Sequence, residues 1–342
     1  MKNKVIKAAV VQAAPVFMDL NASIDKAIEI IQTAAKNKAN IVAFGECWFP
    51  GYPWWCWLAP VAHNVQYFQK YHENCLVRDS DEYYRLAKAA ADNEIFISFG
   101  ASERDHGSLY ISQFLIDDVG QLISARRKLK PTHMERTIFG DGDGSDLLVS
   151  DTELGRIGQL ACWEHLQPLS KYALYSMHEQ IHIAAWPSFS IYPGNANALG
   201  PEVNNAASQI YAVEGQCFVL APCGLITPEW YDMLVTNDAQ AALIGLGGGY
   251  AQIYGPDGSA LCKPLAHTEE GILFADLDLG LISIAKSFAD PVGHYSRPDV
   301  TQLLLNNDSK RPIVKMDATP ENIHFNNVLS NDKPAERESI DE

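Results

Sequence analysis

Short apolar runs alternate with amphipathic segments along most of this chain. In residues 21–36, for example, apolar side chains recur every three or four positions, which places them on one face of a helix. The pattern predicts strands at 4–12, 40–45, 94–101, 108–116, 121–128, 155–161, 181–186, 217–221, 250–254, 259–262 and 272–277. It predicts helices at 21–36, 80–93, 168–177, 202–213 and near 281. Such alternation, with hairpins between some strands, indicates an α/β domain with a mixed sheet layered by helices.

Polar residues indicate where helices start and where the folded domain ends. Asn21 or Ser23 can cap the first helix and Ser80 the second, because their side chains accept hydrogen bonds from free backbone N–H groups. From about residue 306 the chain is polar, and its scattered apolar residues have no period. We therefore expect a domain over 1–305 and a C-terminal tail over 306–342 that is mobile or docked on a partner subunit.

Composition and charge restrict the function classes. The 342 residues carry a formal net charge of −16, and the basic residues form no stripe. Nucleic acids and anionic membranes both select the opposite balance. No apolar run approaches the roughly 18 residues of a membrane helix. The N-terminal run contains Gln12 and stops at Pro15, which argues against a signal peptide. We expect no nucleic-acid partner and no membrane partner.

The cysteine pattern indicates free thiols. The seven cysteines are an odd number, and no two have Cys-x-x-Cys spacing. Without a secretion signal, this favours a reducing, cytoplasmic location. Most free cysteines are buried small apolar side chains, so a reactive thiol has to be argued for individually.

Three strand-like runs end at residues that can do chemistry. The run at 156–161 is followed by Cys162, the run at 42–45 by Glu46, and the run at 125–127 by Lys128. Each also has a simpler explanation: Glu46 as a surface strand end, Lys128 as part of a basic patch, and Cys162 as core filling. Taken together, a thiol, an acid and an ammonium at strand ends suggest a hydrolytic site.

Other motifs have weaker support. His-Glu-Gln-Ile-His at 178–182 matches a zinc-peptidase pattern, which requires both histidines on one face of a helix. Its second half continues into the predicted strand at 181–186, so we expect a helix end followed by a buried strand. The Asp/Gly-rich stretch at 141–146 lacks the glycine and glutamate of a calcium loop, and the glycines at 245–249 lack dinucleotide-binding spacing. No Gly-x-Ser-x-Gly occurs, which weakens a serine-hydrolase interpretation.

The residues around the three strand ends strengthen the hydrolytic interpretation. Phe-Gly-Glu at 44–46, the segment 127–136 and Leu-Ala-Cys-Trp-Glu-His at 160–165 closely resemble the three signature segments of the nitrilase superfamily. Leu-Gln-Pro-Leu at 166–169, the segment 293–299 and the aromatic stretch after Glu46 resemble its nitrilase branch. The resemblance covers roughly residues 5–305, in order. Gly45 departs from it, since many members have proline there, but the difference removes no functional group.

The resemblance implies a fold, a site and an assembly. The implied fold is an αββα sandwich with mixed β-sheets. The catalytic triad falls on Glu46, Lys128 and Cys162, and a second carboxylate falls on Glu135. No cofactor or metal is implied, and the chain is expected to form a homo-oligomer, either a dimer or a larger, spiral assembly, through outer helices. Pocket positions fall on Tyr52, Trp163 and Trp186.

The implied reaction is hydrolysis of an organic nitrile to a carboxylic acid and ammonia. A thiolate is a soft nucleophile that can attack the weakly electrophilic nitrile carbon. We expect Glu46 to take the Cys162 proton and the reaction to pass through a thioimidate and a thioester. Lys128 and the Trp163 backbone N–H would stabilise negative charge on the nitrogen, and Glu135 would orient Lys128 or a water.

Four alternatives stay open from the sequence. An amidase or carbamoylase would share the triad, and a cyanide-degrading enzyme of the same superfamily would share more. A zinc peptidase would use His178, Glu179 and His182. The aromatic segment 48–57 can be a pocket wall beside Glu46, or it can be a lid or subunit contact, which leaves room for a non-enzymatic assembly protein.

Overall fold

Two β-sheets form the centre of the domain in the computed structural model, which describes residues 5–310. The six-stranded sheet has the order β11-β1-β2-β3-β4-β5, and the five-stranded sheet has the order β10-β9-β8-β7-β6. The strands of the first sheet are β1 Val5–Gln12, β2 Ile41–Ala43, β3 Phe96–Asp105, β4 Ser108–Ile116, β5 Leu122–Arg127 and β11 Gly271–Asp278. Those of the second are β6 Val149–Thr152, β7 Gly155–Ala161, β8 Ile181–Ala185, β9 Phe218–Ala221 and β10 Gln252–Tyr254.

Both sheets are mixed. In the first, β1 pairs with β2 and β2 with β3 in parallel, while β3–β4, β4–β5 and β1–β11 are antiparallel. In the second, β7, β8 and β9 are parallel, and β6 and β10 pair antiparallel at the two edges. The predicted hairpin of β4 and β5 is therefore confirmed, as is the mixed character of the sheet.

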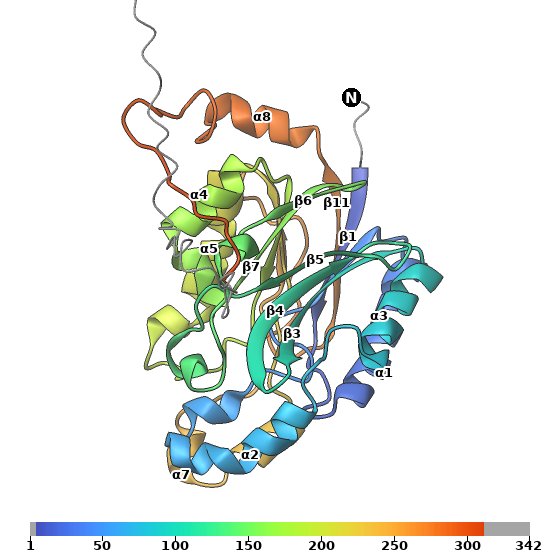
Figure 1. The fold of residues 1–342 in the computed structure, drawn as a ribbon, viewed down its shortest axis with the longest axis vertical. Coiled ribbons are helices and arrows are strands. Elements are labelled where there is room, and N and C mark those ends of the chain that lie inside the picture. The colour runs from blue at the N-terminus through green and yellow to red at the C-terminus, as the bar shows by residue number, and fades with distance from the viewer. Residues whose placement is uncertain (1–4, 311–342) are drawn as a thin grey trace, which may run out of the picture. The chain divides into compact units, whose positions relative to one another are not determined.

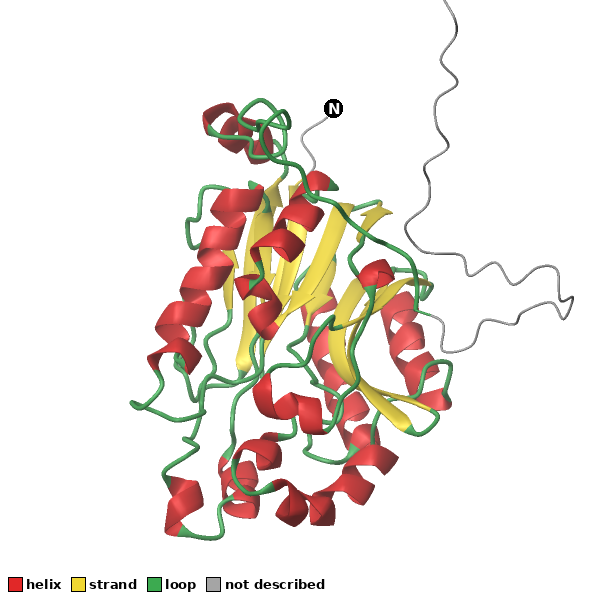
Figure 2. Cartoon of the chain, turned by 60° about the vertical axis from the view of Figure 1, so that its left-hand side comes forward, coloured by secondary structure: helices red, strands yellow, loops and turns green. Residues whose placement is uncertain are grey.

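The sheets pack face to face, with helices on the outer faces (Figures 1 and 2). Side chains of β1 alternate between two apolar clusters, as a strand period of two requires. Ala8 and Val10 share a cluster with Ile183 of β8, whereas Ala9 and Val11 share the other with helix residues. The result is the αββα sandwich that the resemblance implied.

The helices follow the apolar pattern, with differences at their ends. Asp19, rather than Asn21 or Ser23, caps α1 (Leu20–Lys36) by accepting a hydrogen bond from Ala22 N at 2.9 Å, so that cap prediction is wrong. Ser80 caps α3 (Asp81–Asp92) as predicted. The outer helices on the second sheet are α4 (Pro168–Ser176) and α5 (Pro201–Gly215), and α8 (Leu281–Phe288) follows β11.

Three helices were not predicted. They are α2 (Val61–Glu73), α6 (Pro228–Leu234) and α7 (Asp238–Ala241). Only Asn64 and Tyr71 of α2 are buried, so it lacks the buried apolar face by which the other helices were predicted. Short 3₁₀ turns also occur in the loops, at Trp54–Trp57, His133–Thr137, Gly144–Asp146, Cys162–Leu166 and Asn197–Leu199. The predicted strand at 259–262 is only an isolated bridge between Tyr254 and Ala260.

The first compact unit of the chain ends at Asp308. Most of the predicted tail, residues 311–342, lies outside the described residues. Within the described part of the chain, no helix combines the length and the apolar character needed to cross a bilayer.

Candidate active site

Three strand ends bring a carboxylate, an ammonium and a thiol together. Glu46 follows β2, Lys128 follows β5 and Cys162 follows β7. Lys128 Nζ donates hydrogen bonds to Glu46 Oε1 at 2.7 Å and to Glu135 Oε2 at 2.9 Å. The Cys162 sulfur and one carboxylate oxygen each of Glu46 and Glu135 all lie within 4.8 Å of one another. The four residues predicted to be catalytic therefore share one small volume.

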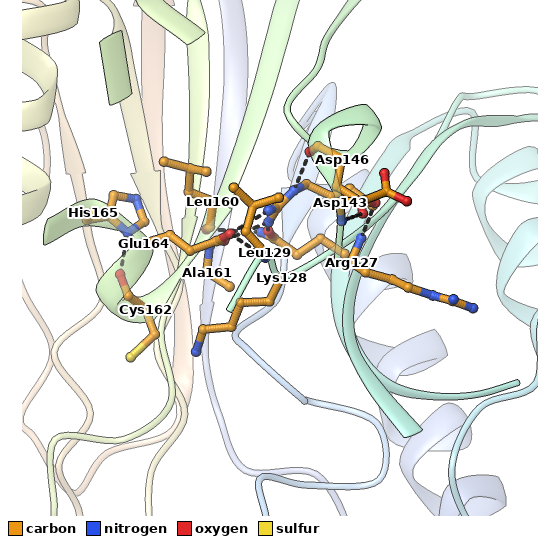
Figure 3. A network of polar contacts seen from close by, with 12 residues as sticks. Arg127, Lys128, Leu129, Asp143, Asp146, Leu160, Ala161, Cys162, Glu164 and His165 are labelled. Carbon is orange, nitrogen blue, oxygen red and sulfur yellow. Dashed lines mark hydrogen bonds and ion pairs between the residues drawn. The ribbon is translucent and has the colours of Figure 1, made fainter. Parts of the chain in front are cut away.

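A tight turn presents the thiol. Ala161 is still extended, with φ −115° and ψ 127°, but Cys162 has φ +49°, in the left-handed region that costs energy for a residue with a Cβ. The chain then enters the 3₁₀ turn Cys162–Leu166, and the Trp163 backbone N–H lies beside the thiol. Figure 3 shows the side chains of Cys162 and Lys128 extending to the same side of these strand ends.

One buried carboxylate ties the ends of β5 and β7 together. Glu164 accepts hydrogen bonds from Leu129 N at 2.9 Å, just after Lys128, and from Ala161 N at 2.8 Å, just before Cys162 (Figure 3). Arg126 donates to both of its oxygens, at 2.7 and 2.8 Å. Burial by itself would raise the pKa of Glu164, but Arg126 and the two backbone donors outweigh burial and hold it below its ordinary value.

Glu135 is held from three directions. It lies in the 3₁₀ turn His133–Thr137, and its Oε2 accepts from Thr132 N at 2.6 Å as well as from Lys128. Its Oε1 accepts from Tyr52 Oη at 2.6 Å, and Tyr52 Oη in turn accepts from Trp57 Nε1 at 3.1 Å. This carboxylate therefore fixes the ammonium of Lys128 and one wall of the site.

Burial dominates the electrostatics of the triad. Removal from water raises the pKa of Glu46 to about 8, although the nearby Lys128 charge opposes the rise. Burial also raises the pKa of the Cys162 thiol, and negative charge on Glu46 adds to this. Burial disfavours the charged form of Lys128, but Glu135 and Glu46 together raise its pKa well above the ordinary value. Glu46 Oε2 is buried without a hydrogen-bond partner, so it is free to exchange a proton with a neighbour.

An aromatic cavity of about 40 Å³ opens onto the thiol. Asn204 Oδ1 accepts from Trp163 Nε1 at 3.0 Å, and Ser208 Oγ accepts from Trp186 Nε1 at 2.8 Å, so α5 holds both indoles in place. The lining is mostly apolar, which suits an uncharged ligand. Its aromatic members are Tyr52, Trp54, Trp57, Trp163, Trp186 and Phe189. A larger cavity of about 360 Å³, between α5 and α8, is lined by other residues.

The zinc-peptidase motif does not form a metal site of the expected kind. His178 lies just after α4 with φ +58°, whereas His182 lies within β8 and contacts Glu179 through Nδ1 at 3.0 Å. Among residues 5–310, the group with ligand-like spacing is Glu46, Glu135 and Cys162. The Lys128 ammonium is already bonded to both of these carboxylates and supplies the positive charge there.

A sequence profile described as carbon-nitrogen hydrolase matches residues 7–286. The chain belongs to this family. It is 53% identical to a nitrilase from Pseudomonas syringae pv. syringae over 92% of its own length and 94% of that protein. It is 50% identical to an arylacetone-specific nitrilase from Alcaligenes faecalis, over 97% and 91% of the two chains. An aliphatic nitrilase from Rhodococcus rhodochrous is 50% identical over 90% of this chain and 84% of that protein.

Solved structures agree with the fold of this carbon-nitrogen hydrolase. An amidase from Nesterenkonia, carrying a covalent adduct at its active-site cysteine, superposes with a TM-score of 0.63 at 17% identity, covering 88% of this chain and 97% of the amidase. The C. elegans NitFhit protein gives a TM-score of 0.68 at 18% identity, covering 91% and 70% of the two chains. At these identities the similarity concerns the fold.

Sequence reasoning assigned no role to several residues of the site. Arg126 and Glu164 lie inside the quoted segments, but only the folded chain shows that they join two strand ends. A charged residue three positions after the end of a predicted buried strand is the signal that would have indicated Glu164. Asn204 was also missed, because it supports the site only through Trp163, a partner distant in sequence. Trp57 belongs to the aromatic segment 48–57 that was expected as a possible pocket wall, but its hydrogen bond to Tyr52 was not predicted.

Proposed function

We propose that this carbon-nitrogen hydrolase is a nitrilase that converts an organic nitrile to a carboxylic acid and ammonia. The observation that supports this most directly is the convergence of the Cys162 thiol, the Glu46 carboxylate and the Lys128 ammonium beside an aromatic cavity that Cys162 and Glu135 line. Identities of about one half to proteins named nitrilase, over nearly the whole chain, support the choice of nitrile over other carbon–nitrogen bonds.

In the first half-reaction, Glu46 Oε2 takes the proton of Cys162 and the thiolate attacks the nitrile carbon, forming a covalent thioimidate. As the C–N triple bond becomes a double bond, the nitrogen gains negative charge and takes the proton from Glu46. An ammonium has three N–H donors, and Lys128 uses two of them on Glu46 and Glu135. Its third N–H and the Trp163 backbone N–H remain for the nitrogen.

In the second half-reaction, Glu46 activates a water that adds to the thioimidate carbon. The tetrahedral species expels ammonia, which leaves with a proton from Glu46, and a thioester remains. A second water then releases the acid and restores the thiol. Glu46 acts alternately as base and acid, and a pKa of about 8 suits both tasks near neutral pH. Glu135 positions Lys128 and the phenol of Tyr52, while Trp163 and Trp186 form walls for an apolar nitrile.

The test of this function is the replacement Cys162→Ala. We expect the variant to fold and its nitrile turnover to fall by at least about 10³-fold, or roughly 4 kcal/mol of barrier. Mass spectrometry of the parent after a brief nitrile soak should show an adduct on Cys162 with the mass of a thioimidate or a thioester. Cys223, a buried free cysteine, provides the control as Cys223→Ala.

Turnover of Cys162→Ala within tenfold of the parent would refute the nucleophile assignment. Assays on matched nitrile and amide substrates, and on cyanide, separate the proposed nitrilase from an amidase or a cyanide-degrading enzyme. A clear preference for the amide would contradict the substrate assignment while leaving the thiol chemistry intact.

The remaining proposals concern assembly and location. Exposed apolar side chains on outer helices support a homo-oligomer: Leu169 of α4 is 69% exposed, and Ile284 and Phe288 of α8 are 57% and 83% exposed. We infer that the catalytic domain ends near residue 305 and that residues 306–342 form a separate tail. All seven cysteines are free, which suits a cytoplasmic, reducing location.

A further inference from the structure

A chain of four buried polar side chains runs behind Cys162, and the mechanism above does not use it. The phenol of Tyr211 donates to Glu179 Oε1. Glu179 Oε2 lies 3.0 Å from His182 Nδ1, and His182 Nε2 lies 2.9 Å from His165 Nε2. His165 Nδ1 lies 2.6 Å from the carbonyl oxygen of Cys162. Each of these side chains is at most 2% exposed, so water does not take the place of any partner.

With both histidines neutral, donation to the carbonyl at one end fixes the direction of every hydrogen bond in this chain. A carbonyl only accepts, so His165 must carry its proton on Nδ1 and, when neutral, accept at Nε2. His182 must then donate from Nε2 and, when neutral, accept at Nδ1. The donor to Nδ1 is therefore a protonated Glu179, whose other oxygen is free to accept from Tyr211. The arrangement is fully satisfied with all four groups uncharged, as a buried network requires.

The Cys162 carbonyl belongs to the same peptide unit as the Trp163 N–H. Because the peptide is planar and trans, its C=O and N–H point in opposite directions. The bond from His165 holds the oxygen toward the interior of the domain, so the N–H points the other way, toward the thiol beside which it lies. A rotated peptide would instead turn an oxygen lone pair toward the place where negative charge develops.

We propose that Glu179, His182 and His165 are positioning residues that lock the Cys162–Trp163 peptide with its N–H aimed at the reacting nitrogen, and that the lock depends on the proton held by Glu179. The role in turnover rests on the proposed nucleophile. Loss of that proton reverses the chain: His182 turns an N–H toward the carboxylate, His165 then donates to His182, and a lone pair faces the Cys162 carbonyl.

The packing around the chain leaves its members little freedom. The His182 and Tyr211 rings stack at 3.7 Å, and His165 stacks on Trp186 at 5.0 Å. A Cβ at position 158 of β7 would lie 2.0 Å from Glu179 Oε2, so a glycine is required there for this carboxyl to approach the strand. The segment 178–182, which matches a zinc-peptidase pattern, therefore supplies a buried, hydrogen-bonded support for the neighbouring strand β7.

The surroundings favour the uncharged forms. Burial raises the pKa of Glu179 to about 8, against a smaller lowering by Tyr211, and burial lowers the pKa of His165 to about 3. Burial likewise lowers the pKa of His182, and the nearby Arg126 charge adds to this. The other titratable and charged groups that face the chain or its immediate neighbours are Glu164, Lys171, Tyr175, Glu214, Cys217 and Lys286.

Glu179→Gln tests the protonation state. A glutamine has the donor and acceptor of a protonated glutamate but cannot ionise. In the parent, a folded pKa near 8 against 4.5 for the unfolded chain means that the folded state binds the extra proton between these values, so stability falls as pH rises across this range. The difference in Tm between Glu179→Gln and the parent should rise by on the order of 5 °C from pH 5 to pH 8 and then level off.

Turnover supplies the second measurement. Glu179→Gln should retain kcat to within about threefold at pH 7 and lose less of it than the parent above pH 8. Glu46 is unchanged in both proteins, so the difference between their pH profiles belongs to Glu179. Glu179→Leu, which offers His182 no donor, should lose at least about tenfold in kcat with little change in KM. Glu214→Gln on α5 is the matched control and should follow the parent.

Each outcome has a definite meaning. A Tm difference that is flat or falls with pH shows that Glu179 is ionised and overturns the proposal. So does a loss of kcat in Glu179→Gln as large as in Glu179→Leu, or full kcat in a folded Glu179→Leu. If Glu179→Leu does not fold, the Glu179→Gln comparisons still decide. The Tm comparison involves no nitrile, so it remains interpretable even if the proposed nitrilase function fails.

Discussion

Lys128 is a buried cation whose charge is balanced by two carboxylates. Its side chain is 1% exposed, and those of Glu46 and Glu135 are 0% and 1% exposed. Removing one partner of such a group leaves the others buried and unpaired, which costs roughly 3–5 kcal/mol. Without the Lys128 charge, which lowers the pKa of Glu46, Glu46 would hold its proton more tightly and be a poorer acceptor for the Cys162 proton.

We therefore expect Lys128→Met to lose nitrile turnover by at least about 10³-fold and to unfold more readily than the parent. Turnover assays and denaturant titration measure the two effects. Lys130→Met is the control, because Lys130 contacts Asp141 on the surface, with a side chain that is 61% exposed. A Lys128→Met variant that turns over nitrile at the parental rate would show that the ammonium has no electrostatic role.

At the residue scale, the sequence indicated the catalytic residues better than the residues that hold them in place. Glu46 and Cys162 each follow an apolar run and Lys128 follows a strand-like run, and that local signal is visible without a structure. The support of Glu135 by Tyr52 joins residues far apart in sequence through one hydrogen bond, so no local pattern reveals it. His182 was interpreted as a buried strand residue, and this was confirmed, but its bond to His165 was invisible.

At the scale of elements, the Arg126–Glu164 pair explains how two strands from different sheets hold their ends in register. The two side chains are 1% and 4% exposed, and Glu164 receives four N–H donors in total. Four donors match the acceptor capacity of one ionised carboxylate. A glutamine in the same place would point its own NH₂ group at one or more of these four N–H donors.

Glu164→Gln should therefore destabilise the folded state by roughly 3–5 kcal/mol at pH 7 and lower nitrile turnover. The folded pKa of Glu164 lies below the ordinary value of 4.5, so its stabilising contribution is full above that pH and is lost as pH falls through the folded pKa. In denaturant titrations from pH 7 to pH 3, the difference in free energy of unfolding between parent and variant should decrease.

The control for this measurement is Glu29→Gln on the exposed face of α1. It changes a carboxylate in the same way without breaking a buried pair, so it should stay within about 0.5 kcal/mol of the parent. If the difference in free energy of unfolding between the parent and Glu164→Gln stays constant down to pH 3, the lost contribution is steric rather than ionic.

The elements themselves were predicted unevenly, for physical reasons. Strands buried on both faces and amphipathic helices have strong apolar patterns, so β7, β4 and α3 were placed within a residue or two of their observed bounds. The helix α2 has an apolar side that remains largely exposed, with Val65 at 69%, and it buries only Asn64 and Tyr71. Its sequence therefore lacks the buried apolar face that marks the other helices.

At the scale of the whole molecule, the pairing order of the strands decides the architecture. Periodicity identified most strands but could not assign β1 and β11, far apart in sequence, to adjacent positions in one sheet. The αββα arrangement was expected from the resemblance to a family, not from the apolar pattern. Strand order depends on non-local contacts, which a local pattern does not encode.

The extent of the folded domain can be tested by truncation. Leu303 and Leu305 are partly buried against the cluster between the sheets, so the apolar packing of the described residues reaches position 305. A chain that ends at residue 310 should keep its Tm within about 2 °C and retain nitrile turnover. Sedimentation of the same chain shows whether residues 311–342 contribute to the proposed homo-oligomer.

A chain that ends at residue 302 is the matched comparison for this truncation. It removes Leu303 and Leu305 and should lower Tm, because their apolar contacts are lost. Equal losses from both truncations, or unfolding of the chain that ends at 310, would show that the domain boundary is wrong.

The hydrogen bonds that Lys128 makes to Glu46 and Glu135 also affect the release of the product. Nitriles are uncharged when they enter an aromatic cavity, but the acid that forms there ionises. Among the described residues that line the cavity, Glu135 already carries the charge type of this product, and two of the three Lys128 N–H groups point at Glu46 and Glu135. An anion gains little from aromatic walls and is repelled by a neighbouring carboxylate. Hydrolysis therefore turns an uncharged ligand into an anion that this cavity binds weakly, which favours release of the product.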